Sequence, residues 1–278
     1  MTAQALDGKK LAQSVRLGLK QKIAAFPQAP GLAVIIAGNN PASEIYVRSK
    51  EKACRETGII PYTYRLPADT SADELLSLIQ KLNASPEISG ILVQLPLPAH
   101  LDTTQILGAV APEKDVDGFH AVNAGNLLLG NPCLAACTPS GIISLIKSTG
   151  VEINGKNAVV VGRSNIVGKP VAVLLLNENA TVTVCHSKTA DLKKHTLEAD
   201  ILVVAVGIKE FIKGDMIKKG AVVIDVGMNR ADGKLYGDVE FDSAKERASF
   251  ITPVPGGVGP MTITMLLKNT VKAANLAR

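Results

Sequence analysis

Tyr46 and Lys50 are a pair of side chains whose types and spacing could do chemistry. They lie four residues apart in the segment SEIYVRSK, which follows the helix-start signals Pro41 and Ser43. Residues four apart share one face of a helix, so an aromatic ring and an amine would lie side by side. Such a pair could stack on a planar ligand and deliver a proton or a charge. A solvated helix face would show the same spacing.

Gln94 closes an apolar run in GILVQLPLP, residues 90–98. Pro96 and Pro98 cannot continue a central ladder, so we expect Gln94 at the carboxyl end of a buried strand. Ligands of parallel sheets bind at that end. The alternative is an amide that only hydrogen-bonds the loop backbone.

Asp115 and Asp117 lie in KDVDGF, residues 114–119. Asp-Gly is first of all a turn signal, and a carboxylate that binds a ligand is the alternative. Two acids in three residues could also bind a metal, but no cluster of carboxylates or histidines accompanies them. The four histidines are scattered and show neither metal spacing nor a Ser/His/Asp order. We expect no metal site.

The stretch NAVVVGRSNIVGKP, residues 157–170, predicts a strand, a turn at Gly162 and a helix from about Ile166. A strand that passes through a tight turn into a helix can bind a dinucleotide pyrophosphate. This stretch departs from the G-x-G-x-x-G pattern, because Ser164 and Val167 replace the second and third glycines. It is either a chance junction or a variant nucleotide site.

The segment after the next predicted strand, residues 181–185, indicates which dinucleotide would bind. NAD sites commonly carry an acid about 20 residues after the turn, and none is present here. The segment HSKT, residues 186–189, offers hydroxyls and a cation instead, and Arg163 adds a second cation. These groups would attract a 2′-phosphate, so the sequence favours NADP over NAD if a dinucleotide binds.

Three further loops contain glycines that permit close approach of a ligand to the backbone. Two follow Val206-Gly207 and Val226-Gly227-Met228. The third, TPVPGGVGPMT at residues 252–262, is restricted by prolines and opens the last predicted helix. A purely structural crossover loop would have the same composition.

The elements that must position these groups alternate between strand-length apolar runs and amphipathic segments. Nearly continuous Val/Ile/Leu runs imply strands buried on both faces, as in parallel sheets. The alternation predicts an α/β fold with right-handed crossovers. The predicted strands cover residues 32–37, 62–66, 90–95, 158–161, 181–185, 201–206, 221–226 and 250–252. The predicted helices cover residues 8–25, 43–57, 72–84, 140–148, 166–177 and 261–276.

The stretch 110–140 is rich in Gly, Pro and Asn and contains no clear strand, so we expect a domain boundary there. The predicted fold has two α/β domains with a cleft between them. The first covers residues 1–139, and the second is a Rossmann-type dinucleotide-binding domain covering residues 140–260. The last helix, 261–278, is expected to pack back on the first domain.

Composition restricts the class of protein. The chain has 278 residues, 46% of them hydrophobic, and a net charge of +5. No apolar run is long enough to span a bilayer, and the first twenty residues lack the apolar centre of a signal peptide. The four cysteines form no disulfide or zinc framework. Without clustered Lys/Arg or many aromatics, nucleic-acid binding is not expected. We expect a cytoplasmic protein that binds neither membranes nor nucleic acids.

Eight segments together resemble the bifunctional methylenetetrahydrofolate dehydrogenase/methenyltetrahydrofolate cyclohydrolase family. Each segment is a weak signal alone, but they occur in family order over essentially the whole chain. The segments are YVRSK (46–50), GILVQLPLP (90–98), KDVDGF (114–119), TPSG (138–141), GRSNIVGKP (162–170), HSKT (186–189), DVGMN (225–229) and PVPGGVGPMT (253–262).

The resemblance implies two reactions: NADP-dependent oxidation of 5,10-methylenetetrahydrofolate to the 5,10-methenyl form, and its hydrolysis to 10-formyltetrahydrofolate. It implies a homodimer that binds tetrahydrofolate derivatives. By resemblance, Lys50 is the main catalytic residue, assisted by Gln94, while Tyr46 stacks on the folate and Asp117 anchors the pterin. The implied catalytic residues are Lys50, Gln94 and Asp117; the folate-binding residues are Tyr46, Lys50, Gln94, Asp117, Gly256 and Pro260; the cofactor-binding residues are Gly162, Arg163, Ser164, Ser187 and Met228.

Other interpretations remain open. One is a monofunctional NAD-dependent methylenetetrahydrofolate dehydrogenase, which the presence of Lys50 and Gln94 and the acid-free HSKT segment disfavour. Another is a folate- or nucleotide-binding protein without turnover. A third, an unrelated Rossmann oxidoreductase acting on a small acid, leaves the motifs of the first half unexplained.

Overall fold

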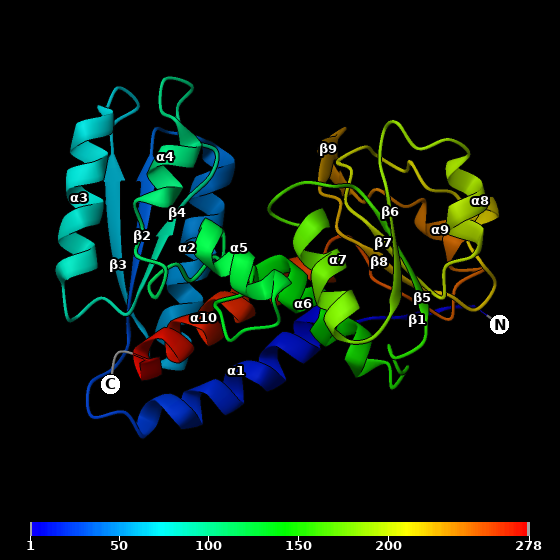
Figure 1. The fold of residues 1–278 in the computed structure, drawn as a ribbon, viewed down its shortest axis with the longest axis horizontal. Coiled ribbons are helices and arrows are strands. Elements are labelled where there is room, and N and C mark those ends of the chain that lie inside the picture. The colour runs from blue at the N-terminus through cyan, green and yellow to red at the C-terminus, as the bar shows by residue number, and fades with distance from the viewer. Residues whose placement is uncertain (1, 277–278) are drawn as a thin grey trace. The chain divides into compact units, whose positions relative to one another are not determined.

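A computed structural model describes residues 2–276 and divides the chain into two compact units (Figure 1). The three-stranded unit consists of Ser14–Cys137 and the chain from Ile263 onward. The six-stranded unit consists of the chain up to Gln13 and Thr138–Thr262. Each unit contains a parallel sheet with helices, so the α/β fold class predicted from the alternation of elements is confirmed.

The three-stranded unit is built on a sheet with the strand order β3-β2-β4. All its pairs are parallel, and Leu32 of the central strand lies opposite Pro61 on one side and Gly90 on the other. Its elements are β2 (Gly31–Ala37), α2 (Pro41–Thr57), β3 (Ile60–Leu66), α3 (Ala72–Ala84), β4 (Gly90–Val93), α4 (Thr103–Gly108) and α5 (Ala121–Leu128). Parts of α1 (Gly8–Ala24) and α10 (Val258–Leu276) complete it.

Helices cover both faces of this sheet. Ala33 and Ile35 of β2 pack in one cluster with Leu75 and Ile79 of α3. The alternate residues of β2 face the other way and are also buried, and α2 contacts β2 and β3. Burial on both faces explains why β2 is a continuous apolar run, and it holds α2 firmly against the sheet.

The six-stranded unit has the strand order β1-β11-β8-β7-β5-β6, and every pair in this sheet is parallel. Strand β5 lies between β6 and β7, so the chain reverses its direction across the sheet beside β5. The elements are β1 (Gln4–Ala5), α6 (Cys137–Ser148), β5 (Asn157–Val161), α7 (Gly168–Asn177), β6 (Thr181–Cys185), α8 (Leu192–Leu197), β7 (Ile201–Val204), η1 (Gly214–Met216), β8 (Val222–Asp225), β9 (Asn229–Ala231), β10 (Lys234–Tyr236), α9 (Phe241–Ala244) and β11 (Phe250–Ile251).

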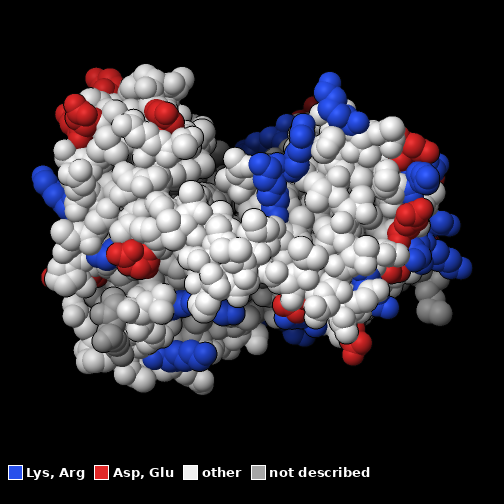
Figure 2. All heavy atoms as spheres, viewed as in Figure 1, with Lys and Arg blue, Asp and Glu red and all other residues white. Residues whose placement is uncertain are grey.

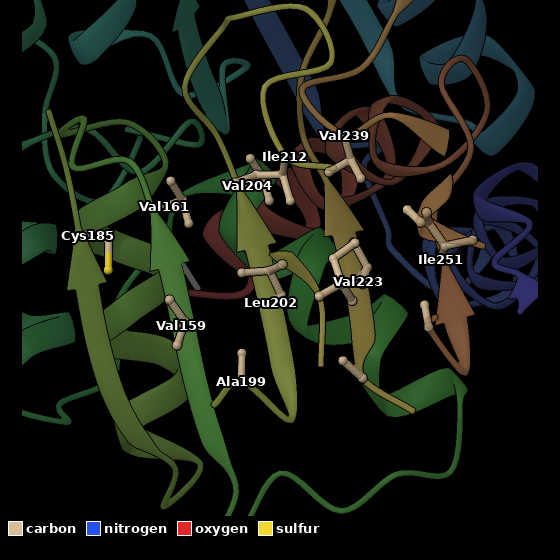
Figure 3. Packing of buried hydrophobic residues seen from close by; sticks show 14 residues of the cluster. Val159, Val161, Cys185, Ala199, Leu202, Val204, Ile212, Val223, Val239 and Ile251 are labelled. Carbon is tan, nitrogen blue, oxygen red and sulfur yellow. The ribbon is translucent and has the colours of Figure 1, made fainter. Parts of the chain in front are cut away.

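One face of this sheet carries a continuous aliphatic cluster (Figure 3). Side chains at alternate positions of neighbouring strands point the same way, including Val159 and Val161 of β5 and Leu202 and Val204 of β7. On the β5–β6 side, α7 contacts both strands. Only 3% of the residues are aromatic, so the core is mainly aliphatic. Close packing of Val, Leu and Ile therefore holds the strands that carry the candidate turn.

The structure differs from the sequence-based expectation in several places. The elements not predicted are β1, α4, α5, α8, η1, β9, β10 and α9. Residues 4–5 form β1 and pair with β11 in the six-stranded sheet, although they were expected in the first domain. The stretch 110–140 contains the helix α5, which was missed because NAGN is a poor helix former and Asn123 is held by tertiary bonds. The last helix begins at Val258, three residues before the predicted start.

Candidate functional site

Lys50 and Gln94 are in direct contact in the three-stranded unit. Lys50 Nζ donates a hydrogen bond of 2.9 Å to Gln94 Oε1. Gln94 Nε2 donates to the carbonyl oxygen of Leu95 at 2.6 Å, which fixes the direction of the amide. Helix α2 positions the amine and the end of β4 positions the amide, because Gln94 N still donates to Ile35 O in the sheet. The structure therefore joins two residues that the sequence singled out separately.

Lys50 is only 9% exposed, which is rare for a lysine. Burial lowers the pKa of its ammonium group, and the nearby carboxyl of Asp117 opposes that shift, with smaller opposing contributions from Cys137 and Cys54. A lysine with a lowered pKa can exchange a proton nearer to neutral pH than an exposed one.

Asp117 lies in a turn that is held by its neighbour Asp115. The carboxylate of Asp115 accepts bonds from the backbone N–H of Gly118 at 3.2 Å and of His120 at 2.8 Å. Asn123 Nδ2 donates to the same carboxylate at 2.9 Å. The turn signal in KDVDGF is thus confirmed. The two acids have different partners: Asp115 accepts the bonds that hold the turn, and Asp117 lies near Lys50.

Gly118 is required in this turn for two reasons. Its φ is +76°, in the region that favours glycine, and a Cβ there would overlap the backbone of Ala135 and Ala136. The close approach of these two segments is what brings Asp117 next to Cys137, whose backbone N–H donates to Asp117 O at 3.4 Å.

Two long-range contacts hold the same segment from outside. Asn269 of α10 donates through Nδ2 to the carbonyl oxygens of Val116 at 2.9 Å and Ala135 at 2.8 Å. Lys114 Nζ donates to three carbonyl oxygens around the end of α3, those of residues 82, 83 and 85. The Lys114 bonds add a donor to carbonyls at the end of α3, and together with the Asn269 bonds they fix the chain on either side of Asp115.

Burial raises the pKa of the Asp117 carboxyl, Lys50 opposes this, Asp115 adds to it, and a hydrogen bond with Cys137 opposes it. Burial also raises the pKa of the Cys137 thiol, further raised by Asp117. Tyr46 is half-buried and lies one helical turn before Lys50 on α2. Thus an amine, an amide and a carboxyl converge in one enclosed place, with an aromatic ring on the same helix.

The glycine turn of the six-stranded unit is closely packed. Gly162 follows β5 with a φ of +123°, and a Cβ there would overlap the carbonyl oxygen of Ala205 after β7. A Cβ at Gly168 would overlap the carbonyl oxygen of Gly162. The glycine that comes one position late in the pattern is therefore the one that lets α7 approach the turn.

Ser164, which replaces the second glycine of the pattern, ties the turn to the start of α7. Its Oγ accepts bonds from the backbone N–H groups of Val167 at 3.2 Å and Gly168 at 3.3 Å. Residues 163–166 are exposed, with Arg163 among them. The turn thus presents a helix N-terminus, a hydroxyl and a cation at the carboxyl edge of the sheet, which suits an anion such as a pyrophosphate.

The segment after β6 forms a compact turn without an acid. Thr189 Oγ1 accepts from His186 N at 2.8 Å, and His186 Nδ1 accepts from Lys188 N at 3.1 Å. Ser187 and Lys188 are exposed. A hydroxyl and an ammonium lie where a ribose-binding carboxylate would stand in an NAD site, so the residues present fit a 2′-phosphate.

The remaining predicted residues lie in the loops after β8 and β11. Met228 is 48% exposed, just after Gly227. Gly256 has a φ of +111°, and Pro260 is half-buried in the first turn of α10. A Cβ at Gly8 would overlap Gly257 O, so the 253–260 loop packs tightly on the start of α1.

The predicted site residues fall in both units. Tyr46, Lys50, Gln94 and Asp117 belong to the three-stranded unit. The other predicted residues belong to the six-stranded unit: Gly162, Arg163, Ser164, Ser187, Met228, Gly256 and Pro260. Sequence reasoning missed Asn269, Asp225 and Asp238, buried polar residues that hold the loops; an Asp at the end of an apolar strand was the available signal for Asp225.

Charge on the surface is mixed. Figure 2 shows Lys and Arg interspersed with Asp and Glu on the face drawn. Several lysines of the six-stranded unit form ion pairs, including Lys193 with Asp215 and Lys218 with Asp200. Across residues 2–276, no group of three or more His, Cys, Asp and Glu side chains is arranged to hold a metal ion. The helices in that range also include none long and apolar enough to cross a membrane.

Two family models match the chain. The "Tetrahydrofolate dehydrogenase/cyclohydrolase, catalytic domain" model matches residues 6–117, and the "Tetrahydrofolate dehydrogenase/cyclohydrolase, NAD(P)-binding domain" model matches residues 136–278. The "Bifunctional protein FolD" of Exiguobacterium sibiricum is 58% identical over 275 residues, which is 98% of this chain and 99% of the relative.

Solved structures are similar over the same range. The bifunctional FolD methylenetetrahydrofolate dehydrogenase/cyclohydrolase of Campylobacter jejuni has a TM-score of 0.96 at 48% identity and covers 99% of both chains. The Trypanosoma brucei methylenetetrahydrofolate dehydrogenase-cyclohydrolase, complexed with NADP cofactor and inhibitor, has a TM-score of 0.95 at 41% identity. It covers 99% of this chain and 98% of its own.

Proposed function

Because this chain belongs to the tetrahydrofolate dehydrogenase/cyclohydrolase family, we propose that it is a bifunctional one-carbon folate enzyme. It oxidises 5,10-methylenetetrahydrofolate to 5,10-methenyltetrahydrofolate with NADP, and then hydrolyses that product to 10-formyltetrahydrofolate. The observation that carries the proposal is the hydrogen bond between the buried Lys50 and the half-buried Gln94, since it provides a tunable amine where ring opening needs one.

The hydrolysis needs proton transfer more than activation of water. The methenyl carbon is already cationic, so water adds to it directly. The water must lose a proton, and the C–N5 bond breaks as N5 takes one up. Lys50 serves both transfers, because burial lowers its pKa below that of an exposed lysine. Gln94 holds the amine without adding charge.

Asp117 and Tyr46 have binding roles in this proposal. Asp117 lies near Lys50 in a turn whose backbone Asp115 holds, and its carboxyl is proposed to pair with the polar edge of the pterin. Tyr46 offers a ring for stacking one helical turn from the amine. Gly256 and Pro260 are proposed to line the folate through the backbone of their loop.

NADP, when bound, supplies the acceptor for the hydride of the methylene carbon. Gly162 and Ser164 would hold its pyrophosphate at the start of α7, and Arg163 and Ser187 would contact the 2′-phosphate. Met228 would contact the cofactor through its backbone, so its side chain is free to vary. In this scheme orientation provides most of the dehydrogenase rate.

The two binding functions are proposed to divide between the two units. Folate is proposed to bind mainly to the three-stranded unit, Ser14–Cys137 with the chain from Ile263 onward, and NADP to the six-stranded unit, which includes the chain up to Gln13. The protein is proposed to work as a homodimer in the cytoplasm without nucleic-acid or membrane partners. An NAD-specific monofunctional dehydrogenase is disfavoured by the acid-free turn after β6.

The decisive experiment measures both half-reactions separately. Reduced nicotinamide is followed with methylenetetrahydrofolate and either NADP or NAD, and cyclohydrolase activity is followed as loss of added methenyltetrahydrofolate. Wild type should use NADP and perform both steps. Lys50→Met should lose the hydrolysis while NADP affinity, measured by calorimetry, is kept. Lys52→Met, on an exposed position of the same helix, is the matched control. Hydrolysis at the wild-type rate in Lys50→Met would remove Lys50 from the mechanism.

A further inference from the structure

Two buried carboxylates, Asp225 and Asp238, form a network that the proposed chemistry does not use. Asp238 is 0% exposed and Asp225 is 4% exposed. Buried carboxylates are costly unless they are satisfied by donors, so their retention needs a structural or functional reason. We call this pair the Asp225–Asp238 network.

Asp238 holds the loop after β7. Its Oδ2 accepts from the backbone N–H of Val206 at 2.6 Å and of Gly207 at 2.9 Å. Its Oδ1 accepts from Asn229 Nδ2 at 2.9 Å. One side chain therefore fixes two consecutive amides of that loop and also the first residue of β9.

Asp225 holds Asp238 in turn. Its Oδ1 accepts from the backbone N–H of Gly227 at 2.9 Å and of Asp238 at 2.8 Å, and its Oδ2 accepts from Val239 N at 2.9 Å. Its own N–H donates to Thr252 Oγ1 at 2.7 Å. The two carboxylates thus link the loops after β7 and β8, and the backbone N–H of Asp225 links Thr252, after β11, to them.

The packing around the network leaves room only for glycine at two positions. A Cβ at Gly227 would overlap the Asp238 backbone and carboxylate, and a Cβ at Gly237 would overlap the Asp225 carboxylate. The glycine after β8 therefore serves the network as well as any approach of a ligand.

The network continues into the glycine turn. Ala205 N donates to Val161 O at 2.8 Å, and the carbonyl oxygen of Ala205 lies where a Cβ of Gly162 would be. The loop that Asp238 holds starts at the next residue. Strand β7 is the neighbour of β5 on the side away from β6. A dinucleotide lies across the point where the strand order reverses, so the half beyond the pyrophosphate, away from β6, falls on this loop.

We infer that Asp238, supported by Asp225, is a positioning residue that sets the loops after β7 and β8 for the nicotinamide half of NADP. This inference rests on the proposed function. Neither carboxylate is assigned a contact with the cofactor. They act through the backbone of Val206, Gly207 and Gly227, whose N–H groups they hold in one arrangement.

The test compares Asp238→Ala with Asp238→Asn. The alanine variant removes all three accepted bonds. The asparagine variant keeps one carbonyl acceptor for Val206 and Gly207 but loses the acceptor for Asn229 Nδ2, which also donates to Tyr236 O and Gly237 O. Asp242→Ala is the matched control, because that carboxylate is exposed on α9 and pairs only locally with Lys245.

The first readout is made on the protein without cofactor. Amide hydrogen exchange at Val206 and Gly207 should accelerate in Asp238→Ala, stay slow in Asp242→Ala and be intermediate in Asp238→Asn. Unchanged exchange at both amides in the alanine variant would overturn the inference, because the carboxylate would then not be holding the loop.

The second readout separates positioning from folding. We expect Asp238→Ala to lose about 10- to 100-fold in dehydrogenase kcat/KM for NADP, as small misplacements of reactants do. Hydrolysis of added methenyltetrahydrofolate, without NADP, should be kept. Partial recovery of the dehydrogenase is expected in Asp238→Asn. An equal fall in both activities, or no fall, would overturn the inference.

If Asp238→Ala does not fold, the asparagine variant alone is used. A selective loss of its dehydrogenase activity would support the inference, and no selective loss would overturn it. Failure of the proposed function looks different, since wild type would then lack NADP-dependent oxidation altogether. If wild type is active and the Asp238 variants have the same dehydrogenase activity, only the positioning role of Asp238 is excluded.

Discussion

Lys50 and Gln94 lie 44 positions apart in the chain, and their side chains meet at 2.9 Å between Nζ and Oε1. The contact pairs a buried amine with an uncharged acceptor whose other end is anchored to Leu95 O. A carboxylate in place of the amide would hold the amine as an ammonium, and an aliphatic side chain would leave it without this acceptor. The amide lies between those extremes, which suits a group that must both take and give a proton.

Gln94→Glu tests this balance. A carboxylate next to Nζ would raise the pKa of Lys50 above its wild-type value and reduce the neutral amine at neutral pH. We expect cyclohydrolase activity to fall by about 10²- to 10⁴-fold, the range of general acid–base catalysis. The rising limb of its pH–rate profile should move to higher pH. Gln105→Glu, an exposed change on α4, is the control. A profile identical to wild type would argue against coupling of the two groups.

Lys50→Met should change how stability depends on pH. Since burial lowers the folded-state pKa of Lys50, the folded protein binds fewer protons than the unfolded chain between that lowered pKa and the unfolded value of about 10.4. Wild-type stability therefore gains a contribution as pH rises through that window, and Lys50→Met lacks it. Urea unfolding at neutral and alkaline pH should show wild type gaining relative to the variant. The free energy of unfolding of Lys52→Met should depend on pH as that of wild type does. If the same were true of Lys50→Met, the desolvation of Lys50 would be contradicted.

Arg163→Ala should reduce the preference for NADP over NAD. The side chain is exposed in the glycine turn, where it could pair with a phosphate. A hydrogen bond between charged groups contributes about 1.5–3 kcal/mol, so NADP should bind about 10- to 100-fold more weakly. NAD affinity should change less, and the difference should shrink in high salt. Calorimetric titration with both nucleotides measures this, with Lys156→Ala at the opposite end of β5 as the control. Equal losses for both nucleotides would place Arg163 on the shared pyrophosphate instead.

Asn269→Leu should loosen the Asp117 turn from a distance. The change removes the donor to Val116 O and Ala135 O; Val116 O keeps the Cys137 thiol as a donor, whereas Ala135 O loses its side-chain donor. We expect a loss of about 1–3 kcal/mol in the free energy of unfolding, the cost of a buried polar group without a partner. The KM for folate should rise while NADP affinity is kept. Lys268→Ala, on the exposed side of the same helix, should leave all three quantities unchanged. A stable variant with normal folate KM would show that Asn269 is dispensable for the turn.

Much of the fold was readable in the sequence because its signals are local. The run Thr181–Cys185 and the helix Ala72–Ala84 were predicted with their observed bounds, since β-branched residues and a capping box act within a few residues. Strand β1 and helix α5 were missed. Gln4–Ala5 becomes a strand only by pairing with Phe250–Ile251, and α5 depends on bonds such as that of Asn123 with Asp115.

The candidate site divides in the same way. The sequence by itself determined which residue types carry the chemistry: Tyr46 and Lys50 one helical turn apart, Gln94 at a strand end, and Ser164 in a glycine turn without a following acid. Only the tertiary structure decided which of them meet and what state they are in. It buried Lys50 against Gln94, and it gave Asp225 and Asp238 their roles. Helix periodicity and turn geometry follow from neighbouring residues, whereas burial, pKa and hydrogen-bond partners depend on groups that only the folded chain brings together.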